Sequence, residues 1–149
     1  MGNLKIPPER TNCVSRVAHK KIPFSGKQTS RLYLLNPSER SVDKVQVDGC
    51  AITEAGRLRC DWAVEVDDEV SHEEIFIELK GSHVSDAVRQ LESTIDALSS
   101  DPAQRKKRCL VAYSRCPLTR REIRLLKRKF QRQYNARFEQ LRNGSSHPL

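Results

Sequence analysis

The stretch IFIELKG, residues 75–81, is an apolar strand pattern interrupted by a glutamate and a lysine two positions apart. Side chains alternate across a β-strand, so Glu78 and Lys80 point to the same side of this strand. The solvated outer face of an antiparallel strand would be enough to explain two such charges. A functional explanation needs partner residues that reach the same face from another strand.

A second strand pattern lies upstream, where residues 59–66 read RCDWAVEV with apolar side chains at alternate positions. The polar stretch between the two patterns, DDEVSHEE, is typical of the exposed end of a hairpin. A turn centred near Glu69 and Val70 sets Asp61 directly opposite Glu78. The sequence therefore predicts a hairpin that brings two carboxylates together on one face.

The same register can be checked along the rest of the predicted hairpin. It builds a continuous apolar face by setting Trp62 opposite Ile77 and Val64 opposite Ile75. It also sets Glu65 opposite Glu74, and like charges that face each other across a ladder are destabilising. We therefore expect the hairpin to splay or bulge at this glutamate pair.

The predicted carboxylate pair has a direct chemical consequence. Directly opposed side chains lie about 4.5 to 5.5 Å apart at Cβ, so Asp61 and Glu78 repel each other unless a cation lies between them. Hard oxygen ligands of this kind favour Mg²⁺ or Mn²⁺. A divalent metal site is the simplest explanation of the pair.

These residues resemble the signature of the PD-(D/E)xK nuclease superfamily, in which an Asp and a Glu-x-Lys motif lie on adjacent strands before a helix. Here the signature is Asp61 followed by Glu78-Leu79-Lys80, and the resemblance covers about residues 44–115. It departs from the superfamily at Cys60, which stands where a proline often precedes the Asp. For the catalytic glutamate that the superfamily can carry on an N-terminal helix, this sequence offers only Glu39, after the letters NPS.

The resemblance implies an α/β fold of the restriction-endonuclease type. In chain order, this fold has a three-stranded antiparallel meander, a helix and a further strand. The strands form one mixed central sheet, and helices flank it. The implied metal ligands for Mg²⁺ or Mn²⁺ are Asp61, Glu78 and the backbone carbonyl of Leu79. Lys80 is the third catalytic residue and orients the attacking water.

Three further residues are auxiliary candidates. Gln90 lies on the expected helix, where nuclease branches of the superfamily carry a glutamine that approaches the site. Asp48 could lie near Asp61 as an extra ligand, although an Asp-Gly step that distorts a strand is the alternative. His83 could contact a phosphate, with a surface or capping histidine as the alternative.

Other patterns complete the predicted chain. We expect a basic N-terminal arm over residues 1–40, loosely ordered or wrapped on the core as short elements, and strands at 44–52 and 108–115. A helix is predicted from the spacing of the apolar residues Val84, Val88, Leu91, Ile95 and Leu98. Thr119 and Glu122 form a capping box, so a second helix is predicted over about 119–142.

Charge is unevenly distributed along the chain. Residues 1–40 carry eight basic and two acidic side chains, residues 41–100 carry five and fourteen, and residues 101–149 carry fourteen and three. An acidic centre between basic flanks fits a cation site with surrounding surfaces that bind a polyanion. The candidate nucleic-acid-binding residues are Arg120, Arg121, Arg124, Lys127, Arg128, Lys129 and Arg132. The alternative is that these charges only keep the protein in solution.

Length and composition predict a single domain of 149 residues, with no apolar run long enough to span a membrane. The five cysteines are odd in number and contain no CxxC pair, which argues against a zinc site or a disulfide framework and for a reducing compartment. We therefore expect a cytoplasmic protein.

The sequence thus predicts a magnesium-dependent nuclease that cleaves phosphodiester bonds, in DNA rather than RNA. Two alternatives stay open, namely a non-catalytic nucleic-acid-binding or adaptor protein on a nuclease fold and an accessory nuclease of a mobile-element or antiphage system. A homodimer or a protein partner in a larger system also stays open.

Overall fold

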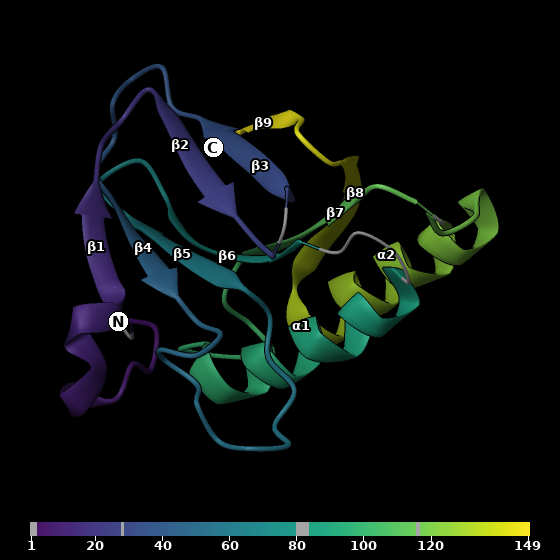
Figure 1. The fold of residues 1–149 in the computed structure, drawn as a ribbon, viewed down its shortest axis with the longest axis horizontal. Coiled ribbons are helices and arrows are strands. Elements are labelled where there is room, and N and C mark those ends of the chain that lie inside the picture. Colours follow the sequence, from purple (N-terminus) through teal and green to yellow (C-terminus); the bar gives the residue numbers. More distant parts are fainter. Residues whose placement is uncertain (1–2, 28, 80–83, 116) are drawn as a thin grey trace.

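A six-stranded mixed sheet with strand order β1-β4-β5-β6-β7-β8 runs through the middle of the molecule (Figure 1). The computed structural model describes residues 3–27, 29–79, 84–115 and 117–149. The strands of this sheet are β1 (Val14–Val17), β4 (Val42–Gln46), β5 (Trp62–Asp67), β6 (His72–Leu79), β7 (Lys107–Tyr113) and β8 (Ala136–Arg142). The remaining elements are the short 3-10 helix η1 (Pro8–Cys13), the helices α1 (Val84–Leu98) and α2 (Arg120–Tyr134), and a smaller sheet of β2 (Lys21–Ser25), β3 (Arg31–Leu35) and β9 (Ser146–Pro148). The prediction of an α/β fold with a mixed sheet is confirmed.

The predicted hairpin is present in the predicted register. Strands β5 and β6 are antiparallel, and their ladder sets Trp62 opposite Ile77 and Val64 opposite Ile75. One step beyond this ladder, the backbone N–H of Asp61 donates to the Ile77 carbonyl at 3.1 Å. The apolar pattern of the two strands was therefore sufficient to fix their pairing, because a slip of one residue would turn every core side chain to the other face.

The expectation of a splay at the glutamate pair is wrong. Glu65 and Glu74 are paired in register, and the ladder continues past them to the hairpin end. Each carboxylate has its own hydrogen-bond donors. Glu74 accepts from the Ser99 hydroxyl at 2.6 Å and the Ser100 backbone N–H at 2.9 Å, and Glu65 accepts from the Leu4 N–H at 3.3 Å. These donors offset the repulsion, so the strands stay paired.

Both helices lie on one face of the large sheet. Strands β6, β7 and β8 are neighbours and parallel, and α1 and α2 connect them in turn. Crossovers between parallel strands are right-handed, so two crossovers in the same direction put their helices on the same side. The predicted apolar stripe of α1 is confirmed, since Val84, Val88, Leu91, Ile95 and Leu98 are all buried in one cluster.

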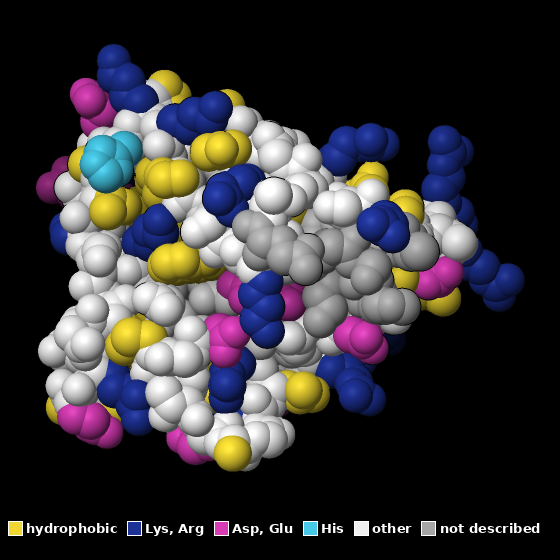
Figure 2. Space-filling model, in the orientation of Figure 1, with side chains coloured by type: hydrophobic (Ala, Val, Ile, Leu, Met, Phe, Trp, Pro, Cys, Tyr) yellow, Lys and Arg dark blue, Asp and Glu magenta, His cyan; other side chains and the backbone are white. Residues whose placement is uncertain are grey.

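The second helix is shorter than predicted. The capping box is confirmed, because the Glu122 N–H donates to Thr119 Oγ1 at 3.2 Å. However, α2 ends at Tyr134, where Asn135 takes a left-handed conformation with φ 52°, and residues 136–142 form β8 rather than a helical extension. Asparagine tolerates this conformation and can end a helix much as glycine does. In Figure 2, Lys and Arg side chains project from the side of the molecule where α2 lies in Figure 1.

The small sheet covers the opposite face of the large sheet. The hairpin β2–β3 buries Ile22, Phe24, Leu32 and Leu34 against the central strands. For residues 3–27 and 29–40 the alternative of short elements wrapped on the core is therefore confirmed, and a loose arm is not, because β1 pairs with β4 and the hairpin forms part of the core. The helices consequently flank one face only. The predicted strand at 44–52 is also shorter, since β4 ends at Gln46 and residues 47–52 form a turn.

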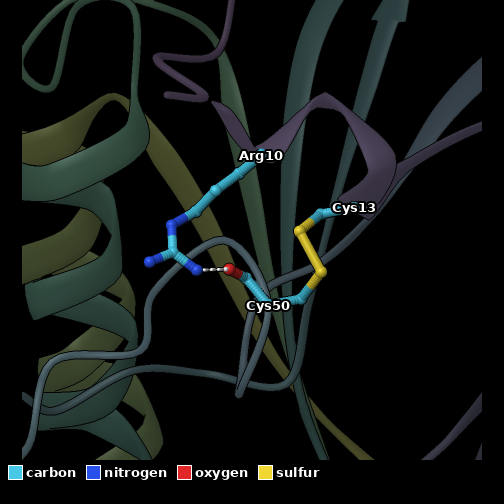
Figure 3. The surroundings of a disulfide bond; sticks show 3 residues. All are labelled: Arg10, Cys13 and Cys50. Carbon is cyan, nitrogen blue, oxygen red and sulfur yellow. Dashed lines mark hydrogen bonds between the residues drawn. A yellow bond between two sulfur atoms is a disulfide. The ribbon is translucent and has the colours of Figure 1, made fainter. Parts of the chain in front are cut away.

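A disulfide joins Cys13 to Cys50 and corrects the expectation that the cysteines form none (Figure 3). Cys13 ends η1, and Cys50 lies in the turn after β4. These segments are 37 residues apart in sequence but meet because β1 pairs with β4, which no local cysteine spacing reveals. Arg10 donates to the Cys50 carbonyl at 2.8 Å beside this bond. Cys60 and Cys109 are free and buried.

Within the described part of the chain, neither helix is long and apolar enough to cross a membrane.

Candidate functional site

Asp61 and Glu78 lie side by side at one end of the central strands of the large sheet. Asp61 directly precedes β5 and Glu78 stands near the end of β6, so the antiparallel pairing brings them to the same end of the two strands. Their carboxyl groups lie within hydrogen-bonding reach of each other. Glu78 is only 3% exposed, so its charge is not on a solvated outer face. The structure therefore brings together the two carboxylates that the sequence predicted as partners.

Asp61 is held in place by the strands on either side of it. Its Oδ2 accepts a hydrogen bond from the Leu79 backbone N–H at 2.8 Å. Its own backbone carbonyl accepts from the N–H of Val47 at 3.0 Å and of Asp48 at 3.4 Å. These bonds link Asp61 to the ends of β6 and β4 and fix the direction of its carboxylate.

The electrostatic surroundings of Asp61 oppose its ionisation. Burial raises the pKa of Asp61, and the nearby charge of Asp48 acts in the same direction. The hydrogen bonds from Leu79 and Glu78 and the positive charge of Lys27 lower this pKa, but they do not outweigh the burial. A half-buried carboxylate beside a second carboxylate favours a cation that can neutralise both.

A cavity of about 190 Å³ opens beside this pair. Its lining residues are Ser25, Gly26, Lys27, Gln46, Asp48, Asp61 and Trp62. Near the centre of Figure 2, Asp and Glu side chains lie between Lys and Arg side chains. Asp48 lines this cavity, where its Oδ1 accepts a hydrogen bond from Arg59 Nε at 2.7 Å, and the Asp48-Gly49 step lies in the turn after β4.

Two predicted site residues, Lys80 and His83, lie outside the described residues. In the described part of the chain, no group of three or more His, Cys, Asp or Glu side chains is arranged to hold a metal ion. The candidate site therefore consists of two carboxylates.

Helix α1 supports the segment that leads into Asp61. The predicted auxiliary residue Gln90 donates from Nε2 to the Arg59 carbonyl at 3.3 Å. One turn further along, Thr94 Oγ1 accepts from the Cys60 backbone N–H at 2.8 Å and donates to the Gln90 carbonyl at 2.8 Å. Thr94 was not among the predicted site residues. Its position four residues after Gln90 on the same helix face was the available signal.

Cys60 is adjacent to Asp61 but is not a nucleophile. It is fully buried, and burial raises the pKa of its thiol well above the usual range, with the charge of Glu78 acting in the same direction. The thiolate is the reactive form of cysteine, so a raised pKa keeps Cys60 inert. Cys60 is therefore a small residue of the core.

The basic residues of α2 are mostly free at the surface. Six of the seven predicted nucleic-acid-binding residues are exposed, namely Arg120, Arg121, Arg124, Lys127, Arg128 and Arg132. Lys129 differs, because its Nζ lies 3.3 Å from Glu92 Oε1 on α1.

The start of α2 lies at the same end of the strands as the carboxylate pair. The helix connects the end of β7 to the start of β8 and therefore runs back along these strands. The backbone carbonyl of its last residue, Tyr134, accepts a hydrogen bond from Lys107 Nζ at the beginning of β7 (2.9 Å), which places that end of the helix at the opposite end of the strands. Arg120, Arg121 and Arg124, in the first turns of α2, consequently lie towards the same end of the strands as the carboxylate pair.

Comparison with known proteins found no matching family model, curated protein or solved structure.

Proposed function

We propose that this protein is a metal-dependent nuclease that hydrolyses phosphodiester bonds, with DNA as the favoured substrate. The observation that carries the proposal is the side-by-side pair of the half-buried Asp61 and the buried Glu78 at the open end of the β5–β6 hairpin. A pair of acidic side chains in this position has no hydrophobic role, and both members can be ionised together only when a cation offsets their repulsion. The resemblance to the PD-(D/E)xK nucleases supports the same conclusion.

The residues present fit a hard divalent cation. The donor atoms are carboxylate oxygens, and Asp61 is already oriented by the Leu79 N–H at 2.8 Å. Oxygen ligands of this type suit Mg²⁺ or Mn²⁺ rather than a soft transition metal. Asp61 and Glu78 would hold the ion, with the Leu79 carbonyl as a third protein ligand by resemblance.

The chemistry requires an activated water and stabilisation of the charge on the phosphoryl oxygens. A bound Mg²⁺ supplies Lewis acidity and lowers the pKa of a coordinated water. By resemblance, Lys80 orients the attacking water and supplies a point charge next to the phosphate, as a lysine ammonium can do. Gln90 and Thr94 of α1 hold the residues before Asp61 and so keep this carboxylate in position.

The basic surface of α2 supports nucleic acid as the substrate. Arg120, Arg121 and Arg124 are exposed, and they lie towards the end of the strands where the carboxylate pair is found. Like charges three or four residues apart on one helix repel each other, and a polyanion relieves this repulsion. Contacts of this kind position the backbone of a nucleic acid without reading its bases.

The proposal is tested by incubating purified protein with Mg²⁺ or Mn²⁺ and labelled duplex, single-stranded and branched DNA, and with RNA. We expect cleavage of at least one DNA substrate, its loss in EDTA, and its loss in Lys80→Ala with DNA binding retained. Folded protein that leaves every substrate intact while still binding DNA would instead indicate the adaptor function.

A further inference from the structure

We propose that the tip of the β2–β3 hairpin, namely Ser25, Gly26 and Lys27, is a wall of the active site and that Lys27 binds a phosphate oxygen of the nucleic-acid strand. This inference rests on the proposed nuclease function and adds to it a phosphate-binding residue outside the predicted motif. The tip comes from the N-terminal part of the chain and reaches the site from the face opposite the helices (Figure 1).

The tip is anchored to the strand that follows Asp61. Trp62, the first residue of β5, donates from its indole Nε1 to the Ser25 carbonyl at 2.8 Å. The rings of Phe24 and Trp62 meet edge to face with centroids 5.9 Å apart. Lys44 Nζ lies 4.7 Å from both ring centroids and donates to the Pro23 carbonyl. These contacts fix the tip relative to the carboxylate pair.

The tip also lies directly against the residue that follows Glu78. A β-carbon added at Gly26 would come within 2.8 Å of the Leu79 Cβ, which is closer than two such atoms can approach. The hairpin closes through a hydrogen bond from the Gly26 N–H to the Ser30 carbonyl at 3.0 Å. A glycine is therefore required here, because only a residue without a side chain lets the tip approach β6 this closely.

Lys27 brings a positive charge to this position. It lines the same cavity as Asp61 and Asp48, and its charge lowers the pKa of Asp61, although burial outweighs this effect. Its side chain is exposed, and among the residues that the structure describes it forms no ion pair. A lysine ammonium on a flexible stem can shield the carboxylates in the free protein and contact a phosphate when a strand is bound.

The size of the cavity indicates what it can hold. Its volume of about 190 Å³ is below the roughly 300–1,000 Å³ of pockets that enclose drug-sized ligands. A phosphate group with its bound water fits this space better than a whole nucleotide does. The cavity therefore suits one phosphodiester of a strand that runs across the site, with its bases outside.

The test compares Lys27→Ala, Lys27→Arg and the matched control Lys20→Ala, which removes an exposed lysine just before the other end of β2. The first readout is binding of a fluorescein-labelled 30-base DNA by anisotropy in EDTA. We expect Lys27→Ala to raise Kd about tenfold, as loss of a charge-assisted hydrogen bond does, and Lys27→Arg to stay within threefold of wild type. Lys20→Ala should bind like wild type.

The second readout is cleavage of the same DNA in Mn²⁺, where Lys27→Ala should raise KM about tenfold and change kcat less than threefold. A Kd in Lys27→Ala within twofold of wild type would overturn the inference, and so would an equal loss in Lys20→Ala. If wild type binds DNA through Lys27 but never cleaves it, the phosphate-binding role stands and the nuclease proposal fails. If wild type cleaves with no dependence on Lys27, the nuclease proposal stands and this inference fails.

Discussion

Removal of one carboxylate of the pair should separate the stability of the fold from its response to metal. Asp61→Asn keeps an oxygen that can accept the Leu79 N–H but removes a buried charge beside Glu78. We therefore expect this variant to melt at or above the wild-type temperature in EDTA, because both the burial of the charge and the repulsion are relieved. Binding of Mn²⁺ should be weakened at the same time.

The expected magnitude follows from ligand linkage. An ion that binds only the folded state stabilises it by about 2.7 kcal/mol at one hundred times Kd. For a chain of 149 residues this raises Tm by about 5 to 10 °C. If Asp61→Asn weakens Kd about a hundredfold, the same concentration leaves about 0.4 kcal/mol, or a shift of about 1 °C. Differential scanning fluorimetry over a Mn²⁺ series measures both proteins directly.

Glu54→Gln provides the matched control, because it removes an exposed carboxylate that forms an ion pair with Arg57 at the surface. This variant should respond to Mn²⁺ as wild type does. A wild-type Tm that ignores Mn²⁺ up to millimolar concentration would refute the metal site. An Asp61→Asn variant that gains as much as wild type would refute the role of Asp61.

Two further predictions concern ion pairs away from the site. Arg108→Met should lower the free energy of unfolding, measured in urea, by about 3 to 5 kcal/mol, because it leaves the buried Glu73 without the guanidinium that lies 2.8 Å away. A Glu73→Met/Arg108→Met double variant removes both charges and should recover part of this loss. A double variant that recovered none of it would contradict the reasoning. The Arg40 side chain, with the Ser71 and Val70 N–H groups, holds the pKa of Asp68 well below its unfolded value of about 3.9, so Asp68→Asn should lower Tm at pH 7. This loss should shrink as pH falls below about 4 towards the folded pKa, whereas a loss of Tm that stays constant down to pH 2 would exclude the linkage.

The hairpin and the first helix could be predicted from the sequence because each has a regular apolar period. Alternation in β5 and β6 fixed the register of the ladder from Trp62 to Asp67, and Asp61 and Glu78 come next to each other just beyond its last pair. The end of α2 could not be predicted in the same way, because Asn135 was the only local stop signal and the next residues are polar enough to continue a helix. The alternation of Ala136 and Phe138 in β8 was the pattern that competed with it.

The N-terminal contribution to the site was missed for a different reason. The residues of the β2–β3 hairpin alternate as strands should, but a proline such as Pro23 inside the pattern weakens the signal for a strand. Proline is tolerated there because β2 is an edge strand of the small sheet. The proximity of Lys27 to Asp61 depends on how two sheets stack, and no local pattern encodes this. The same holds for the pairing of Cys13 with Cys50.

The disulfide has a topological consequence for the site. Its two cysteines lie 37 residues apart, and the chain between them contains the whole β2–β3 hairpin. The hairpin tip with Lys27 is therefore part of a closed covalent ring. A single proteolytic cut at this exposed tip would leave both pieces joined through Cys13 and Cys50. Only a cut combined with reduction would separate the segment before the break from the rest of the protein.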